Sequence, residues 1–177
     1  MASINGVSIK AFKKFRGHEG EELYQGNVYY NGKKLGFWSQ DAHGGICDNF
    51  EFDETVLNNE SEKYKNYSGN VSEEDKKYYD VTFFMIALSD LTIAEKQFKK
   101  GLKNGYHSLV KISGGGFETY WSTSMPASTE KEKDAVLKMY HDRFVDGFKK
   151  GTPKWAHEDI KVTVYGENDF TVEYPAA

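Results

Sequence analysis

The dipeptide Asn31-Gly32 is the feature that most constrains how this chain folds. It stands between two runs of alternating apolar and polar residues in the stretch ELYQGNVYYNGKKLGFWSQ. A two-residue type I′ turn requires positive φ at both central residues, and Asn followed by Gly adopts such angles readily. The sequence therefore predicts an antiparallel hairpin in which residues 23–30 pair with residues 33–40.

Neighbouring segments extend this hairpin into a meander. Residues 7–15 alternate between apolar and polar with one slip, which indicates a strand with a bulge. Residues 49–53, NFEFD, are typical of a further strand that follows a turn at residues 43–45. Residues 53–69 are polar with few apolar anchors, and they are compatible with a short helix or an ordered loop. The start of the chain is thus predicted to be an antiparallel meander.

Two helices are predicted in the second half of the chain. Residues 92–105 and residues 129–151 each open with a Thr-x-x-Glu capping box, and each ends at a glycine. Apolar residues recur near helical spacing in both segments. Pro153 lies just beyond the second segment, where it cannot continue a helix.

The apolar run VTFFMIAL, within residues 80–88, is compatible with a buried strand or with a helix. Its β-branched and aromatic residues favour a strand, so residues 80–88 are predicted to form a central strand. Two later hairpins are predicted at residues 106–123 and 159–174. Together these elements predict an α+β fold, in which an antiparallel sheet built from hairpins carries two well-capped helices, in a single domain over residues 1–177.

Charge is distributed unevenly along the chain. Residues 1–40 carry a net charge of +3, residues 41–80 carry −7 and residues 81–177 are neutral, within a total of −4. An acidic middle disfavours phosphate contacts there, because these need Lys and Arg, and it favours a basic protein partner or a solvated surface. No apolar run reaches the length of a membrane span, and the single cysteine suits a reducing compartment. We therefore expect a cytoplasmic protein without membrane contact.

Asp41, His43 and Cys47 are the candidate catalytic residues, because they supply an acid, a base and a thiol close together in the sequence. A turn between strands does not require their side chains to converge, and a lone cysteine is commonly a small buried hydrophobe. The histidines lack the paired spacing of zinc sites. The sequence thus predicts no metal and no cofactor, and a small enzyme using these three residues is an alternative interpretation.

A Lys-rich helix offers another class of function. Lys96, Lys99, Lys100 and Lys103 share one side of the helix predicted over residues 92–104, where they suit phosphate contacts. Lysines on an amphipathic helix commonly face water instead. A DNA-binding accessory protein that uses this helix is therefore a second alternative.

The stretch FRGHEGEELYQGNVYYNGKKLGFWSQDAHGG combines a G-x-E-G turn, an NGKKLGF hairpin and a D-x-x-GG turn. In these motifs the chain resembles small proteins carried by phages, plasmids and other mobile elements of low-GC Gram-positive bacteria. Some accessory proteins of this size look like anti-CRISPR inhibitors, and the chain is similar in style to those that act on type II CRISPR nucleases. The resemblance implies a non-enzymatic protein that binds and inhibits a host defence nuclease, and it assigns no functional residue.

The charge pattern supplies candidate contact residues for such a partner. RNA-guided nucleases hold nucleic acid in basic channels. An acidic protein surface with exposed aromatic anchors can compete with the nucleic acid for such a channel. The residues predicted to contact the partner are Trp38, Asp41, Asp48, Glu51, Asp53, Glu54, Glu73, Glu74, Asp75 and Tyr79.

Overall fold

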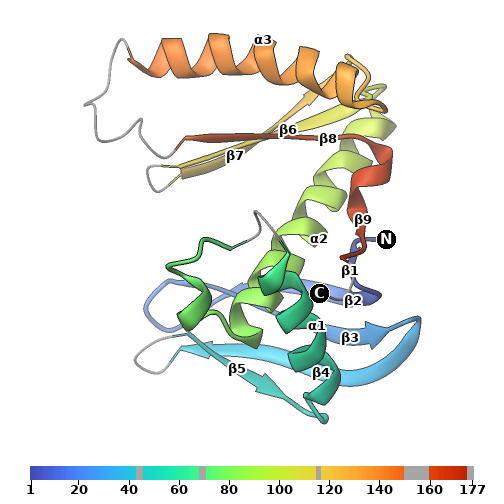
Figure 1. The fold of residues 1–177 in the computed structure, drawn as a ribbon, viewed down its shortest axis with the longest axis vertical. Helices are drawn as coiled ribbons and strands as arrows, with labels where there is room; N and C mark the ends of the chain where they lie inside the picture. Colours follow the sequence, from blue (N-terminus) through green and yellow to red (C-terminus); the bar gives the residue numbers. More distant parts are fainter. Residues whose placement is uncertain (43–45, 68–70, 115–116, 150–159, 175–177) are drawn as a thin grey trace. The chain divides into compact units, whose positions relative to one another are not determined.

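The computed structural model is an α+β fold of helices and mostly antiparallel strands, as predicted (Figure 1). Contacts divide the chain into two compact units. The first unit comprises residues 1–92 and 171–177, and the second comprises residues 93–170. Each unit contains its own sheet, and the single domain predicted for the whole chain stays a prediction. The structure describes residues 1–42, 46–67, 71–114, 117–149 and 160–174.

The sheet of the first unit is built around the predicted hairpin. Its strand order is β5 (Ile46–Phe50), β4 (Lys33–Ala42), β3 (Glu22–Tyr30), β2 (Val7–Arg16), β1 (Ser3–Ile4) and β9 (Thr171–Val172). Tyr30 pairs with Lys33, and Asn31 and Gly32 have φ angles of 48° and 80°, so the two-residue turn is confirmed. The predicted bulge in β2 is also confirmed, because the register shifts around Ala11, whose φ is 51°.

The strand predicted at residues 49–53 lies earlier in the chain than expected. Strand β5 ends at Phe50, and Asp53 instead stands before helix α1 (Thr55–Asn66). Its Oδ1 accepts hydrogen bonds from the Thr55 amide at 2.9 Å and from the Thr55 hydroxyl at 2.6 Å. An acidic side chain there satisfies one of the free amides of the first helical turn, so Asp53 belongs to the start of α1 and not to a strand.

The strand predicted at residues 80–88 is wrong, because this run opens the 23-residue helix α2 (Val81–Lys103). Phe84, Met85 and Leu88 recur at helical spacing and are fully buried. Asp80 begins the helix, since its Oδ1 accepts the amide of Thr82 at 2.9 Å. Thr92 lies inside the helix rather than at a cap, and its hydroxyl donates to the Leu88 carbonyl at 2.8 Å.

The core of the first unit draws on its sheet and on both helices. Its fully buried side chains include Val28 in β3, Trp38 in β4, Leu57 in α1 and Phe84 in α2. The Tyr30 hydroxyl donates to the buried Glu60 carboxylate of α1 at 3.2 Å. Burial of large apolar side chains from all these elements stabilises their packing.

The sheet of the second unit has the strand order β7 (Phe117–Thr123), β6 (Ser108–Gly114) and β8 (Lys161–Tyr165). The predicted hairpin at residues 106–123 is confirmed, since β6 and β7 pair from Ser108 and Thr123 onward. Helix α3 (Glu130–Lys149) packs Val136 and Tyr140 against Val110 and Ile112 of the sheet. The end predicted for this helix, at residue 151, lies outside the described residues.

The capping box that begins α3 is confirmed. The Glu132 amide donates to the Thr129 hydroxyl at 3.3 Å, and the Thr129 amide donates to the Glu132 carboxylate at 3.0 Å. Two backbone donors at the helix start are thereby satisfied reciprocally.

The hairpin predicted at residues 159–174 is wrong. Strand β8 is followed by the short helix η3 (Glu167–Phe170), and β9 then pairs in parallel with β1 of the first unit, with Ser3 opposite Thr171. Phe170 is buried and stacks on Tyr165 with ring centroids 5.5 Å apart, so packing holds the turn in a helical form.

In the part of the chain that the structure describes, no helix combines the length and the apolarity that a membrane span needs.

Candidate functional site

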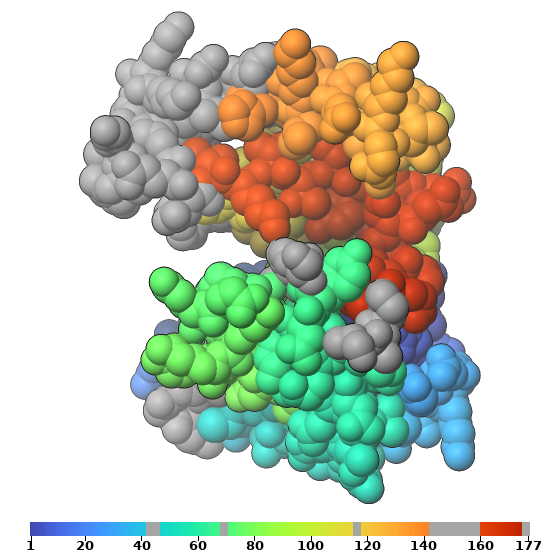
Figure 2. Space-filling view, in the orientation of Figure 1, coloured from blue at the N-terminus to red at the C-terminus, as the bar shows by residue number. Residues whose placement is uncertain are grey.

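The segment of residues 71–83 leads from the connection after α1 into the first three residues of α2, and it contains the short helix η1 (Lys76–Tyr78). We call it the 71–83 segment; it lies at the surface of the first unit, in green in Figure 2. Ser72 and Asp75 close its turn, because the Ser72 hydroxyl donates to Asp75 Oδ2 at 2.5 Å and accepts the Asp75 amide at 3.2 Å. Side-chain bonds thus hold this exposed connection in a defined shape.

Aromatic rings stack along one side of the segment. Tyr79 stacks on Tyr64 with centroids 5.8 Å apart and an interplanar angle of 21°, and on Phe83 at 5.5 Å and 27°. The stack ends at Phe83, which keeps 48% of its surface exposed, and the adjacent Tyr78 is 67% exposed. Large exposed apolar surface of this kind is typical of interaction sites.

These rings line a pocket of about 340 Å³, which we call the aromatic pocket. The residues that line it are Val71, Ser72, Asp75, Tyr78, Tyr79 and Phe83. Among these described residues Asp75 is the one acid, and none is a lysine or an arginine. A pocket with aromatic walls and a carboxylate favours a cation over an anion.

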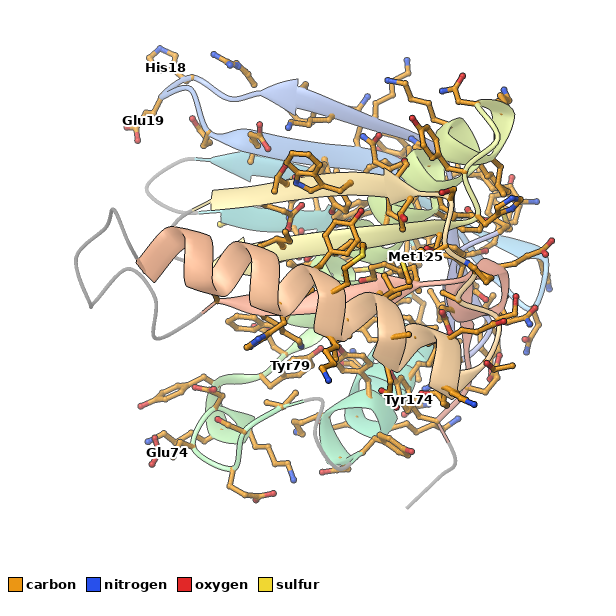
Figure 3. All side chains as sticks on the ribbon, turned by 90° about the horizontal axis from the view of Figure 1, so that it is seen from above. His18, Glu19, Glu74, Tyr79, Met125 and Tyr174 are labelled. Carbon is orange, nitrogen blue, oxygen red and sulfur yellow. The ribbon has the colours of Figure 1, made fainter. Side chains whose placement is uncertain are left out.

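The charge around the pocket is also acidic. Glu73 pairs with Lys76 at 2.5 Å, and Glu74 is exposed and projects outward from the turn (Figure 3). The first unit as a whole carries ten Lys and Arg against sixteen Asp and Glu, a net charge of −6, whereas the second unit carries thirteen against eleven, a net charge of +2. The 71–83 segment therefore presents its pocket on the acidic unit, where a positively charged partner is attracted.

The Tyr79 hydroxyl is buried and has no hydrogen-bond partner among the described residues. Burial raises the pKa of Tyr79 above its ordinary value, with the nearby Tyr64 and Asp80 adding to the shift, so the phenol stays neutral. An unpartnered buried hydroxyl is destabilising, because it gives up its bonds to water without replacement.

Tyr79→Phe is therefore expected to raise the free energy of unfolding by about 1 kcal/mol, since it removes the unpartnered hydroxyl and keeps the stacked ring. Equilibrium urea denaturation measures this change. Tyr30→Phe is the matched control, because the Tyr30 hydroxyl does have a partner in Glu60, and its loss lowers stability. A Tyr79→Phe protein less stable than the parent contradicts the expectation.

Trp38 is fully buried, so the prediction of an exposed aromatic anchor at this position is wrong. Its Nε1–H donates to Asp48 Oδ1 at 2.9 Å. Burial raises the pKa of Asp48, although hydrogen bonds from Thr82, Trp38 and Gln40 partly offset this rise. Trp38 is a core residue, and the half-buried Asp48 is its hydrogen-bond partner, so the two form a structural pair.

The remaining predicted contact residues fall into three groups. Asp53 is committed to the start of α1, and Glu54 beside it is half-buried. Asp41 is exposed near the end of β4, and Glu51 is exposed directly after β5. Glu73, Glu74, Asp75 and Tyr79 all lie in the 71–83 segment, and of these Asp75 and Tyr79 line the aromatic pocket.

Sequence reasoning missed Val71, Ser72, Tyr78 and Phe83 as pocket residues. The signal was present, because the run EEDKKYYDVTFF places four aromatic residues shortly after the acids Glu73, Glu74 and Asp75. Residues 80–88 were predicted to be a buried strand, and this removed Phe83 from the candidates.

Asp41 and Cys47 lie directly opposite each other in the β4–β5 pair, and Cys47 is exposed. His43, the base of the candidate catalytic group, lies outside the described residues. No group of three His, Cys, Asp or Glu residues suited to a metal ion occurs in the described ranges.

Part of the positive charge on the Lys-rich side of α2 is neutralised by an ion pair. Lys99 donates to the buried Glu95 carboxylate at 2.7 Å, and burial lowers the pKa of Lys96. The Lys99–Glu95 ion pair reduces the net charge that this side of the helix offers to a phosphate backbone.

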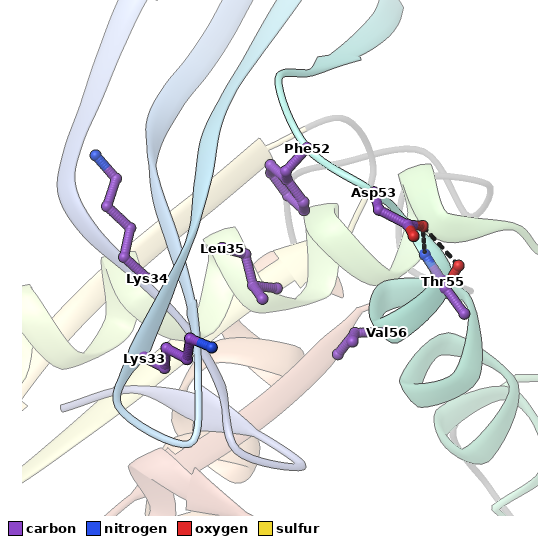
Figure 4. A pocket seen from close by; sticks show the side chains of 7 residues that line it. All are labelled: Lys33, Lys34, Leu35, Phe52, Asp53, Thr55 and Val56. Carbon is purple, nitrogen blue, oxygen red and sulfur yellow. Dashed lines mark hydrogen bonds between the residues drawn. The ribbon is translucent and has the colours of Figure 1, made fainter.

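A second pocket of about 360 Å³ lies between the β3–β4 turn and the start of α1 (Figure 4). It is lined by Lys33, Lys34, Leu35, Phe52, Asp53, Thr55 and Val56. Its carboxylate, Asp53, already accepts two hydrogen bonds from Thr55. This pocket is lined by both lysines and an aspartate, so its charge favours neither a cationic nor an anionic ligand.

No protein-family model, curated protein or solved structure matches this chain.

Proposed function

We propose that this protein binds a basic protein partner through the 71–83 segment, and that the partner is a host defence nuclease of the type II CRISPR class, which it inhibits in the bacterial cytoplasm. The observation that supports the proposal is the aromatic pocket, because exposed rings line it together with Asp75, which follows Glu73 and Glu74 in the chain, on a unit with a net charge of −6. The nuclease as partner rests on the resemblance of residues 15–45 to mobile-element proteins.

Electrostatics and burial have separate roles in this function. Acidic side chains speed association with a basic surface and select against acidic partners. Tyr78 and Phe83 then supply the apolar area that becomes buried in the complex, since aromatic residues dominate the energy of protein interfaces. Occupation of a basic channel by such a surface competes with the nucleic-acid backbone that the channel holds.

A charge-reversal experiment tests the proposal. The probe is a type II CRISPR nuclease loaded with guide RNA, and its affinity for the protein is measured by surface plasmon resonance together with target-DNA cleavage. The double variant Glu73→Lys, Glu74→Lys is expected to bind at least ~10-fold more weakly and to lose inhibition, since rim charges govern encounter with a charged surface.

The double variant Glu19→Lys, Glu62→Lys is the matched control. Glu62 pairs with Lys65 at 2.5 Å, as Glu73 pairs with Lys76, and Glu19 is exposed, as Glu74 is. Both double variants change the net charge equally, so the control is expected to retain binding. Failure of the parent protein to bind the loaded nuclease overturns the proposal, and so does an equal loss in both variants.

A further inference from the structure

We infer that the aromatic pocket binds an arginine side chain of the partner protein. The inference rests on the proposed function, since it names the chemistry by which the 71–83 segment recognises its partner. It goes beyond a general acidic surface, because it assigns one cationic group to one pocket.

The aromatic walls supply the first part of the recognition. Tyr79 and Phe83 are stacked nearly parallel, and Phe83, at the end of this stack, is 48% exposed. A planar guanidinium stacks on an aromatic face and extends such a series of rings. A lysine ammonium is compact and strongly hydrated, so it uses a flat aromatic wall less well than arginine does.

Asp75 supplies the second part. Its Oδ2 accepts the Ser72 hydroxyl at 2.5 Å, and this bond fixes the carboxylate at the wall of the pocket. Oδ1 is the other acceptor of the same carboxylate, and a guanidinium N–H can donate to it. The cation would thus meet ring faces and a fixed negative charge at the same place.

The size of the pocket suits a side chain. Its volume of about 340 Å³ lies at the lower end of the range of ligand pockets, which is about 300–1,000 Å³. Lys77 already lies over the ring of Tyr78, with its Nζ 4.6 Å from the ring centroid. Lys77 is not among the residues that line the pocket, so it leaves the pocket open to another cation. Its position shows that the Tyr78 ring accepts a cation in this structure.

The test is an NMR titration of the ¹⁵N-labelled protein with the tripeptide acetyl-Gly-Arg-Gly-amide. The expected result is a set of saturable shifts of amide signals from residues 71–83. The same tripeptide with citrulline, which has the shape of arginine without its charge, is expected to bind at least ~10-fold more weakly, since the cation supplies the attraction. Free arginine is expected to bind no more tightly than the tripeptide, because its carboxylate faces an acidic surface.

Phe83→Ala is expected to weaken tripeptide binding at least ~5-fold, because it removes the exposed end of the stack. Ile86→Ala is the matched control, since Ile86 is also exposed in the first part of α2 and does not line the pocket. Equal binding of the arginine and citrulline tripeptides overturns the inference, as do shifts outside residues 71–83, an equal effect of both substitutions, or tighter binding of free arginine. The titration contains no nuclease, so its failure leaves the charge-reversal result intact and is distinguishable from failure of the proposed function.

Discussion

Trp38→Ala is expected to lower the free energy of unfolding of the first unit by about 3–5 kcal/mol, because it empties the largest fully buried site in the described structure. The substitution also removes the donor that lies 2.9 Å from Asp48 Oδ1. Asp48 would then remain without its indole partner, and this adds to the loss.

Two control variants separate these contributions. Trp38→Phe keeps an aromatic ring and removes the N–H donor, so it is expected to cost about 1–3 kcal/mol. Trp121→Ala removes a tryptophan that is 46% exposed in the second unit, and it is expected to cost less than about 1 kcal/mol. Urea denaturation followed by far-UV circular dichroism measures all three. A loss of less than about 1 kcal/mol for Trp38→Ala shows that Trp38 is not a core residue.

Gly166→Ala is expected to destabilise the second unit by about 3 kcal/mol, because a side chain there meets backbone rather than a movable side chain. A Cβ atom at Gly166 would overlap the carbonyl oxygen of Ala127, and Gly166 is itself buried. The Gly166 amide also donates to Asp169 Oδ2 at 2.7 Å, so a shift of the backbone here would break the turn that leads to Phe170.

Gly105→Ala is the matched control for this effect. Gly105 has a φ of +80°, and no atom lies within 4 Å of the place that an added methyl group would take. Its substitution therefore costs only the conformational strain, about 1 kcal/mol. Thermal unfolding of the two variants compares the two mechanisms. A Gly166→Ala protein as stable as the Gly105→Ala protein contradicts the proposed overlap with Ala127.

Features that depend on adjacent residues were predicted correctly. The Asn31-Gly32 turn and the Thr129–Glu132 capping box both form as expected, because their hydrogen bonds and backbone angles are satisfied within a few residues. The bulge in β2 belongs to the same class, since one extra residue at Ala11 was visible as a slip in the alternation.

Predictions that depended on distant packing were less successful. The run VTFFMIAL has the β-branched and aromatic residues of a strand, yet Phe84, Met85 and Leu88 are buried along one side of α2. The β-branched Val81 and Thr82 lie in the first turn, where Asp80 satisfies the amide of Thr82. Burial therefore outweighed the local preference of these residues.

The candidate site was predicted in part. Charge alone located Glu73, Glu74 and Asp75, and the structure places Asp75 in the wall of the aromatic pocket, with Glu73 and Glu74 just before it in the chain. Charge could not show that Trp38 is buried with Asp48 as its hydrogen-bond partner, because the face that a strand residue occupies depends on the register and on what covers the sheet. Tyr78 and Phe83 were missed for a related reason, since their exposure follows from where α2 begins.

By itself the sequence determined the hairpin at residues 31–32, the start of α3, the α+β class and the acidic character of residues 41–80, because each follows from local backbone preferences or from counting charges. Only the tertiary structure decided that residues 81–103 form one helix, that β9 pairs with β1, and that Tyr79 and Phe83 stack beside Asp75. These features depend on apolar burial and strand pairing between residues far apart in the chain, and no local pattern specifies which distant partner is chosen.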